Sequence, residues 1–437
     1  MVSNSPRAVV EVLRRIPVFT IYSIPEPVVR EIKLTINRSG TGQSLRHPGR
    51  IPLSVVLVLV VAYMAIAPNL DQPFINYGFA SSIIFLAAAR SQSRHWIVAL
   101  ATAAGLSLGH AFFRGAGIAA PEMDLYAGML GRSCLLVLGW RRIWASPEDS
   151  ERLRGIWLLQ VGIVSFVLAS TVALNLTVLA HLRVLDSYLY VFDGSLGFQP
   201  SFVIGRLFSR YKLVAEIAKV GYRSLPIVLA LASAGYLKSG SPWRPLSVLT
   251  SAGVLGYLLY WVFPATGPLY VAGGNFPNFP PSFDMLRQMR LHAIALHVPA
   301  PRNAMPSLHM AWALLLWFTC RPFSRVWRGF SLAYVALTVV ATLGTGEHYL
   351  VDLVVALPFS VAVQALWTPA ERPTRNIVLA GATSLTLIWL VVLRYGSDVF
   401  LLSPLIPWAC AVVSTAISLA LERVLFYLSA ASRSAVF

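Results

Sequence analysis

The sequence predicts an all-α integral membrane protein with about 12 transmembrane helices. The chain has 437 residues, of which 57% are hydrophobic and only 12% are charged, and its mean hydropathy is +0.67. A soluble domain carries roughly 25% charged residues. The polar residues are therefore too few to cover a water-facing surface, and the apolar residues are gathered in runs long enough to approach the thickness of a bilayer.

Each predicted helix corresponds to one apolar run of near-spanning length. The runs cover residues 52–68, 73–89, 95–113, 125–141, 156–180, 213–237, 245–264, 306–321, 329–345, 349–367, 376–394 and 402–424. The run at 73–89 is short, and Arg132 interrupts the run at 125–141. The number of spans is therefore approximate.

The net charge of +17 is distributed unevenly between the two sides of the predicted membrane. Twenty-three of the 35 Lys and Arg residues lie in the N-terminal segment, the C-terminal tail and the loops on their side, whereas nine lie in the opposite loops. The positive-inside rule then places both termini in the cytoplasm, and the excess charge needs no nucleic-acid partner. We expect a multi-pass protein of the bacterial cytoplasmic membrane. The first 50 residues are too polar and too long to begin a cleavable signal peptide.

Four segments follow from these patterns. We expect a cytoplasmic segment at 1–50, accessory transmembrane helices at 51–155, a central transmembrane core at 156–370 and further transmembrane helices at 371–437. Two parts of the core do not have the composition of spans. Residues 181–212 carry Asp, Gly and Pro among large aromatic residues, which suits an element lying along the outer interface. Residues 265–305 form an outer loop rich in Pro, Gly and Asn, and long loops of this kind are often functional.

Two histidines stand at the start of apolar runs on the predicted outer side. His309 belongs to "PSLH" (306–309), and His348 belongs to "GEHYLVD" (346–352). Asp352 follows His348 by four residues, so the two side chains share a helix face. A carboxylate inside a membrane helix is expensive unless it is paired, and His348 is its natural partner. The carboxylate can accept the Nδ1–H of the imidazole and direct Nε2 outward.

Two histidines and an aspartate at one membrane surface suit phosphoryl transfer. One histidine can attack phosphorus while the other protonates the leaving oxygen. Pro306 fits the first turn of its helix, where the missing N–H costs nothing, and the free N–H groups of that turn could hold phosphate oxygens. We count Ser307, in the same stretch, among the candidate phosphate ligands.

These residues resemble the type 2 phosphatidic acid phosphatase superfamily. "PSLH" and "GEHYLVD" look like its second and third signature motifs. "LDSYLYVFDGSLGF" (185–198) and "FPATGPLY" (263–270) look like the branch that contains fungal inositol phosphorylceramide synthase and bacterial relatives. The resemblance extends over roughly 181–368. It implies a six-helix catalytic core in the C-terminal half, with His348 as nucleophile, Asp352 as the residue that orients it, and His309 as general acid.

The chain departs from the superfamily where phosphate is usually bound. The superfamily has Ser-Arg shortly before the nucleophile, whereas this chain has Ala341 and Thr342, and its first motif, a lysine followed by Arg-Pro, is missing. We therefore expect the phosphate ligands to be Lys219 and Arg223, which are four residues apart on one helix face, and Arg302, which lies just before "PSLH".

Two of these expectations have open alternatives. Lys219 and Arg223 could simply extend along their span toward the interface. Tyr270 completes the candidate substrate-binding residues, although it could instead anchor the interface.

Three classes of function remain open. We favour a lipid phosphotransferase that moves a phosphate or a phosphoinositol-like head group through a phosphohistidine. The donor would be a phospholipid or a lipid-linked phosphate, and the acceptor would be a lipid or polyol alcohol. The enzyme would be surrounded by membrane lipids, and we expect it to need no cofactor and no metal. The long outer loop favours transfer because it can exclude water. A lipid phosphate phosphatase that hydrolyses polyprenyl or glycerolipid phosphates is the near rival.

The other two classes fit less well. A multi-span transporter would suit the number of spans, but the ionisable residues gather at one surface and no inverted repeat is visible. A metal hydrolase could use His309, His348, Asp352 and Glu347, but no H-E-x-x-H motif is present. Cysteine spacing adds no support, since Cys134, Cys320 and Cys410 fit neither a zinc site nor a disulfide framework.

Overall fold

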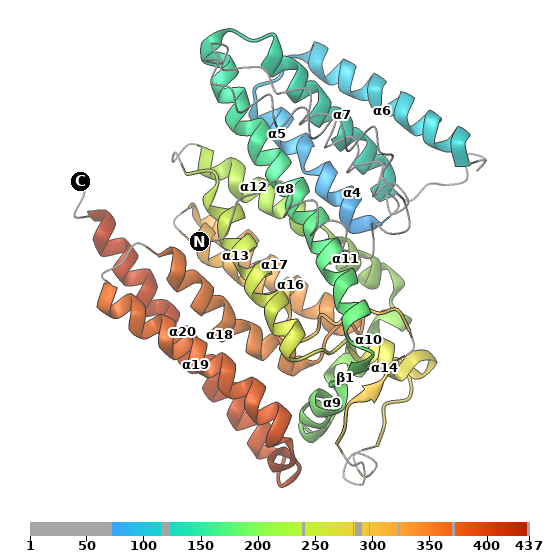
Figure 1. Ribbon diagram of the computed structural model, residues 1–437, viewed down its shortest axis with the longest axis vertical. Coiled ribbons are helices and arrows are strands. Elements are labelled where there is room, and N and C mark those ends of the chain that lie inside the picture. Colours follow the sequence, from blue (N-terminus) through green and yellow to red (C-terminus); the bar gives the residue numbers. More distant parts are fainter. Residues whose placement is uncertain are drawn as a thin grey trace, which may run out of the picture. The chain divides into compact units, whose positions relative to one another are not determined.

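The computed structural model describes residues 72–114, 123–237, 241–282, 284, 291–296, 298–321, 323–368 and 372–434. The segment expected to be cytoplasmic at 1–50 and the span expected at 52–68 lie outside the described residues. Within the described ranges the regular secondary structure is helical apart from one two-stranded sheet (Figure 1).

The described helices fall into three groups along the chain. The first group is α4 (Pro73–Ala80), α5 (Ser82–Ala88), α6 (Ser93–Arg114), α7 (Met123–Ile143) and α8 (Pro147–Ala180). The second is α9 (Asp186–Ser195), α10 (Pro200–Arg210), α11 (Lys212–Arg223), α12 (Leu225–Tyr236), α13 (Arg244–Val262), α14 (Pro268–Ala272) and the 3-10 helix η4 (Gly273–Asn275). The third is α16 (Leu308–Cys320), α17 (Arg325–Gly344), α18 (Leu350–Trp367), α19 (Arg372–Tyr395), the 3-10 helix η5 (Ser397–Leu401) and α20 (Leu405–Ser434).

Six of the described helices are long and apolar enough to cross a membrane, namely α8, α13, α17, α18, α19 and α20. The pair α11 and α12, bent by 52° where they meet, is a seventh candidate if it counts as one span. The pair α4 and α5 and the 13-residue helix α16 are shorter. The structure thus supports a helical membrane-embedded protein, whereas the expected number of about 12 spans is not confirmed.

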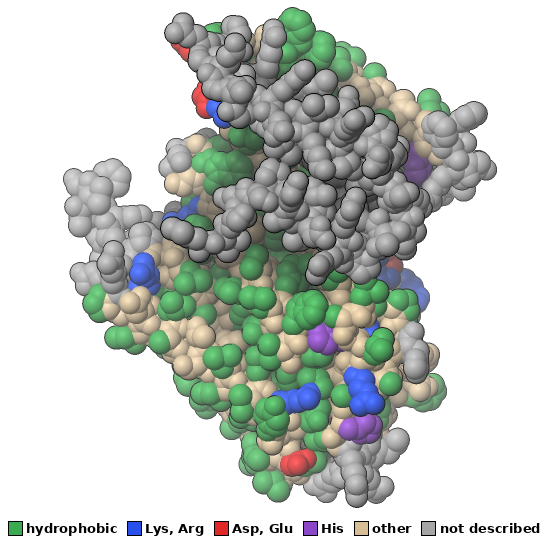
Figure 2. Space-filling model, viewed as in Figure 1, with side chains coloured by type: hydrophobic (Ala, Val, Ile, Leu, Met, Phe, Trp, Pro, Cys, Tyr) green, Lys and Arg blue, Asp and Glu red, His purple; other side chains and the backbone are tan. Residues whose placement is uncertain are grey.

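The surface of the described residues agrees with a lipid-facing protein. Large hydrophobic side chains are exposed on most of the long helices, including Leu258 on α13, Ile388 on α19 and Val412 on α20. In the lower part of Figure 2, hydrophobic side chains cover much of the visible face and charged groups are few and scattered. Such a surface would be unfavourable in water over so large an area.

The two helices that begin with the histidine motifs are packed inside the bundle. α16 contacts α12, α13, α17 and α18, and α18 contacts α9, α13, α16, α19 and α20. The starts of α16 and α18 meet directly, because the N–H of Ser307 donates to the main-chain carbonyl of Asp352 at 3.2 Å. This contact brings together two sequence motifs that are separated by all of α17.

The segment 181–212 and the loop 265–305 are joined by the only described sheet. Strand β1 (Arg183–Val184) pairs antiparallel with β2 (Ile294–Ala295), with Arg183 opposite Ala295 and Val184 opposite Ile294. The first segment also holds α9 and α10, and the loop also holds α14 and η4. The two segments expected on the outer interface therefore form one connected layer beside the starts of α16 and α18.

Candidate active site

His348 lies in the turn between α17 and α18. The turn passes through Gly346, whose φ of +75° favours glycine, and a Cβ there would lie 2.7 Å from the ring of Phe276. Gly267, with φ +113°, comes so close to the same turn that a Cβ would lie 2.3 Å from the carbonyl oxygen of Glu347. These two glycines let the loop before α14 close onto the turn that holds His348.

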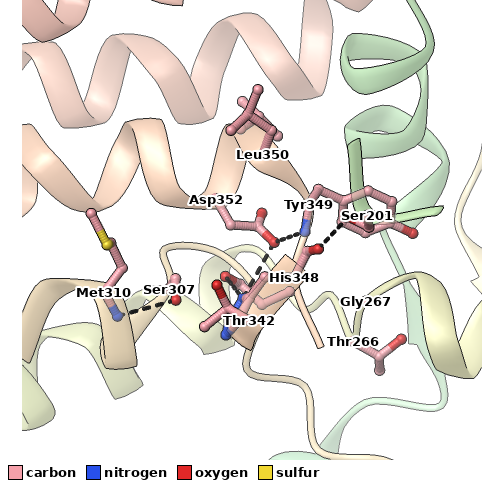
Figure 3. A network of polar contacts seen from close by, with 12 residues as sticks. Ser201, Thr266, Gly267, Ser307, Met310, Thr342, His348, Tyr349, Leu350 and Asp352 are labelled. Carbon is pink, nitrogen blue, oxygen red and sulfur yellow. Dashed lines mark hydrogen bonds and ion pairs between the residues drawn. The ribbon is translucent and has the colours of Figure 1, made fainter. Parts of the chain in front are cut away.

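The imidazole of His348 is buried and held in one orientation. Its Nδ1 lies 3.1 Å from the carbonyl oxygen of Ala304 and 3.4 Å from Oδ2 of Asp352 (Figure 3). An Nδ1–H facing two oxygens fixes the tautomer, so Nε2 keeps its lone pair. Nε2 is buried and has no hydrogen-bond partner among the described residues. The hydroxyl of Ser201 donates to the main-chain carbonyl of His348 at 2.7 Å and holds the backbone in place.

Asp352 makes the contact with His348 that the four-residue spacing predicts. Its Oδ2 also accepts the N–H of Tyr349 at 2.8 Å, so the carboxylate caps α18 while facing the imidazole. The shorter bond to Nδ1 nevertheless comes from the main-chain oxygen of Ala304, which the sequence did not indicate. The orienting role is thus divided between a carboxylate and a carbonyl.

His309 lies in the first turn of α16. Ser307 is the N-cap of this helix, and its side-chain oxygen accepts the N–H of Met310 at 3.4 Å. Pro306 was expected in the first turn, but that expectation is wrong: the helix starts at Leu308, and Pro306 lies one residue before the cap. The hydroxyl of Ser307 therefore serves the helix start, and its role as a phosphate ligand stays a prediction.

Aromatic rings from three helices surround His309. The ring of Tyr222, from α11, stacks on the imidazole with centroids 3.9 Å apart. Phe74, from α4, and Trp312, from α16, meet it edge to face at 6.0 Å and 5.7 Å. Nε2 of His309 is buried and unpartnered among the described residues, and the ring lies within electrostatic range of His348. The two histidines thus each present a buried, unpartnered nitrogen within one site.

Glu347 lies beside this site instead of in open solvent. Its carboxylate accepts the hydroxyl of Tyr270, which lies 3.1 Å from Oε1 and 3.3 Å from Oε2. Burial raises the pKa of Glu347, while nearby His348, the bond from Tyr270 and the charge of Arg223 oppose that shift. Tyr270 is therefore bound to the residue next to His348, and its role toward substrate stays a prediction.

The three predicted phosphate ligands lie in different surroundings. Arg223 ends α11 within electrostatic range of Glu347, next to the Tyr222 ring that stacks on His309. Lys219 instead pairs with Glu216 at 2.8 Å on the exposed side of the helix.

Arg302 is buried, and its guanidinium donates to main-chain carbonyls of His181, at 2.9 Å, and Ala300. Of the three cations, Arg223 has the strongest structural support as a phosphate ligand.

Two aspartates of α9 hold the turn around His348 in place, and neither was among the residues that the sequence predicted for the site. Oδ2 of Asp193 accepts the N–H of Leu350 at 2.8 Å, and its Oδ1 accepts the N–H of Val351 at 3.2 Å, so this carboxylate caps α18 from outside. Burial raises the pKa of Asp193 to about 8, nearby Asp352 adds to the shift, and the two N–H donors oppose it.

Asp186 stands two turns earlier on the same face of α9. Its Oδ1 accepts the N–H of Gly267 at 2.8 Å and the hydroxyl of Tyr349 at 3.1 Å, and its Oδ2 accepts the N–H of Thr266 at 3.1 Å. Burial raises the pKa of Asp186 to about 6 against these donors. The seven-residue spacing of two acidic residues in "LDSYLYVFDG" was the signal that could have revealed both.

Replacing Asp193 with asparagine should lower kcat by about 10-fold to 100-fold and leave KM near the wild-type value. The amide would leave one N–H of the first turn of α18 without an acceptor, which loosens the helix that orients His348 but touches no substrate. Steady-state kinetics on 4-nitrophenyl phosphate measure both constants. Asp398→Asn, an exposed aspartate of η5, is the matched control. A rise in KM at unchanged kcat would contradict the positioning role.

The pH dependence of the first chemical step should reflect the burial of His348. Burial lowers the pKa of His348 to about 4 from its usual value of 6.5, although Glu347 and the Ala304 carbonyl oppose the shift. The imidazole is then neutral, and able to attack, down to much lower pH than a solvated histidine. With 4-nitrophenyl phosphate, which needs little help from an acid, kcat/KM should fall only as pH approaches about 4. A midpoint near 6.5 would show that the nucleophile is solvated.

Comparison with known families points to phosphate chemistry. Residues 187–366 match the family described as the PAP2 superfamily, and this match covers less than half of the chain. It includes α9 except for Asp186, both histidine motifs and nearly all of α18, and it supports phosphatase or phosphotransferase activity on phosphate-containing lipids. No curated protein and no solved structure matches the chain. Among the described residues, no three His, Cys, Asp or Glu side chains are grouped as they would be to hold a metal ion.

Proposed function

We propose that the protein is a membrane-embedded lipid phosphotransferase that works through a phosphohistidine on His348. The observation that supports this most directly is the buried Nε2 of His348, which has no hydrogen-bond partner in the described part of the chain while Ala304 and Asp352 hold Nδ1. A nitrogen in this state is a nucleophile that needs no further deprotonation.

The first half of the reaction uses both histidines. Nε2 of His348 attacks phosphorus, an N–P bond forms, and the P–O bond to the leaving group breaks. The leaving oxygen takes a proton from Nε2–H of protonated His309. Asp352 and the carbonyl of Ala304 face the positive charge that develops on the attacking ring, and the cation of Arg223 balances the phosphate.

The second half returns the enzyme to its starting state. An acceptor hydroxyl attacks the phosphohistidine, an O–P bond forms and the N–P bond breaks. The hydroxyl proton goes to His309, which is thereby ready to act as an acid again. We favour an alcohol over water as acceptor because both reactive nitrogens are buried and the outer layer of α9, α10 and α14 lies beside them.

Product analysis tests this function. Purified protein in lipid nanodiscs receives labelled phosphatidic acid, phosphatidylinositol or a polyprenyl phosphate, each with and without excess glycerol or diacylglycerol. We expect the label to appear on the added alcohol, as measured by mass spectrometry. Inorganic phosphate as the sole labelled product in every reaction would assign a phosphatase, and no release from any donor would contradict the enzymatic assignment of the site.

We further propose that both termini are cytoplasmic and that the site opens on the outer face of the membrane. Cysteines introduced at Asn278 and Asp398 should react with an impermeant thiol reagent in intact cells, and a cysteine at Arg375 should not. The chain without introduced cysteines gives the background, to which Cys410 can contribute because it is only partly buried, whereas Cys134 and Cys320 are buried. Labelling at 375 alone would invert the topology and place the chemistry in the cytoplasm.

A further inference from the structure

The pair of helices α10 and α11 touches the candidate active site at both of its ends. At the start of α10, the hydroxyl of Ser201 donates to the main-chain carbonyl of His348 at 2.7 Å. At the end of α11, the ring of Tyr222 stacks on His309 with centroids 3.9 Å apart. Residues 210–213, where the two helices join, are exposed. α11 therefore runs from the surface of the described residues to the candidate general acid, and at about 1.5 Å per residue its length is roughly 18 Å.

One face of α11 is packed against α17. Ala215 and Ala218 are buried in a cluster with Ala341 of α17, and a Cβ on Gly221 would lie 2.3 Å from the side chain of Leu337. α11 and α12 together form a candidate membrane span, bent by 52° where the two helices meet. Since packing this close fixes the rotation of α11 about its axis, the residues on its other faces also keep fixed directions.

A stripe of charged residues follows the length of α11. Its members succeed one another at intervals of four, three and four residues, which places them on one side of the helix, and they are Lys212, Glu216, Lys219 and Arg223. The first two are exposed, whereas the last two are partly buried. Arg223 directly follows Tyr222, whose ring stacks on His309. This charged stripe therefore begins at the surface and ends beside the ring that covers the candidate general acid.

An apolar stripe runs beside the charged stripe. It consists of Leu213, Ile217 and Val220, which are 74%, 55% and 47% exposed. Each of them follows a member of the charged stripe by one residue, which is about 100° around the helix. On a candidate span, exposed apolar side chains of this kind face the lipid tails. The charged stripe thus lies next to a lipid-facing surface.

The charges of the charged stripe are not balanced. Lys219 pairs with Glu216 at 2.8 Å. Neither Lys212 nor Arg223 forms an ion pair with a carboxylate in the part of the chain that the structure describes, so the stripe has three cations and one anion. Ionisable residues in a membrane span are costly and commonly mark the path of a substrate. The excess of positive charge suits an anionic head group.

We propose that the charged stripe of α11 is the path along which the phosphate head group of the donor lipid moves from the membrane surface to the two histidines. This inference rests on the proposed function, in which the donor is a lipid that carries phosphate. The phosphate is bound first by Lys212 and then by Lys219 and Arg223, while the acyl chains stay against the apolar stripe. A head group with a net negative charge fits this path better than a zwitterionic one, because the same cations would repel an ammonium group.

A comparison of two donors tests the path. The full-length enzyme in phosphatidylcholine nanodiscs receives either phosphatidic acid, which must arrive through the bilayer, or 4-nitrophenyl phosphate, which arrives from water. We expect Lys212→Gln to lower kcat/KM for phosphatidic acid by about fivefold, the scale of one exposed charge pair, and to leave kcat unchanged. The constants for 4-nitrophenyl phosphate should stay at their wild-type values, because this donor does not use the path.

A second variant should have the opposite effect. Glu216→Gln removes the carboxylate that repels the phosphate and holds Lys219, so kcat/KM for phosphatidic acid should rise by about twofold. Raising NaCl from about 0.05 M to about 0.5 M should weaken the effects of both variants, because salt screens exposed charges.

A matched control separates the path from the overall charge of the protein. Arg183→Gln removes an exposed cation of β1 and should keep the wild-type constants for both donors. An unchanged kcat/KM for phosphatidic acid in Lys212→Gln would overturn the path, and so would an equal fall for both donors, which indicates a damaged site. Should Lys212→Gln fail to fold, Glu216→Gln decides, because the path predicts a gain. Wild type that turns over 4-nitrophenyl phosphate but not phosphatidic acid would instead contradict the lipid donor of the proposed function.

Discussion

His348→Ala should lower the turnover of 4-nitrophenyl phosphate by about 10,000-fold, the scale seen when a nucleophile of a triad is removed. The methyl group leaves nothing in the site that can attack phosphorus, and the nearby carboxylates are capping helices or accepting hydrogen bonds. The release of nitrophenol measures the loss, and size-exclusion chromatography of the purified variant confirms that it is folded.

Two comparisons make this result specific. His95→Ala removes a histidine of α6 whose ring accepts a main-chain N–H. This variant should turn over 4-nitrophenyl phosphate at the wild-type rate. Asp352→Asn should lose about 100-fold or more, because the amide no longer fixes the tautomer of His348, although the Ala304 carbonyl still holds Nδ1. Near wild-type turnover by purified His348→Ala would end the assignment of the nucleophile.

His309→Gln should separate the two histidines by the leaving group of the donor. With phosphatidic acid, whose leaving alcohol needs a proton, turnover should fall by about 100-fold to 10,000-fold. With 4-nitrophenyl phosphate, whose leaving group departs as a stable anion, the loss should be below about tenfold, because little protonation is required. Glutamine keeps a hydrogen-bonding group within the aromatic surroundings but cannot act as an acid.

The control for packing around His309 is Tyr222→Phe, which keeps the stacked ring and should affect both donors equally. If His309→Gln lost part of its turnover equally on both donors, His309 would have a structural role, and the general acid would have to be sought elsewhere. If it lost nearly all turnover on both donors, as expected for removal of a nucleophile, the roles of the two histidines would be exchanged.

The core of the site was readable from sequence because its parts follow helical spacing. The four-residue interval between His348 and Asp352 predicts their contact, and the loop count predicts that His309 enters from the same side. Ser307 at the start of an apolar run is also a recognisable cap. The rule that buried carboxylates need partners, applied to Asp186 and Asp193, would have placed them in the site as well.

Other parts of the site have no local signature. The closest partner of Nδ1 is the carbonyl of Ala304, and any residue could supply a carbonyl. The contact of Phe74 with His309 depends on how α4 packs against α7 and α11, which is set by residues far apart in the chain. The expected number of spans is not confirmed, and α16 is shorter than the run expected at 306–321 for a related reason: the residues before Leu308 fold into the site instead of lengthening the helix, which leaves it with 13 residues.

The most direct test of the proposed mechanism is to trap the phosphohistidine. Wild type and the two histidine variants are mixed with labelled 4-nitrophenyl phosphate, quenched within less than one turnover, and worked up in alkali, which preserves phosphohistidine. Peptide mass spectrometry should find the label on His348 in wild type. In His309→Gln the label should also be on His348 but should form more slowly, and His348→Ala should carry no label. Label retained by His348→Ala but absent from His309→Gln would show that His309 is the nucleophile. An absence of label from wild type at every quench time would mean that the acceptor attacks the donor directly, and the covalent mechanism would be wrong.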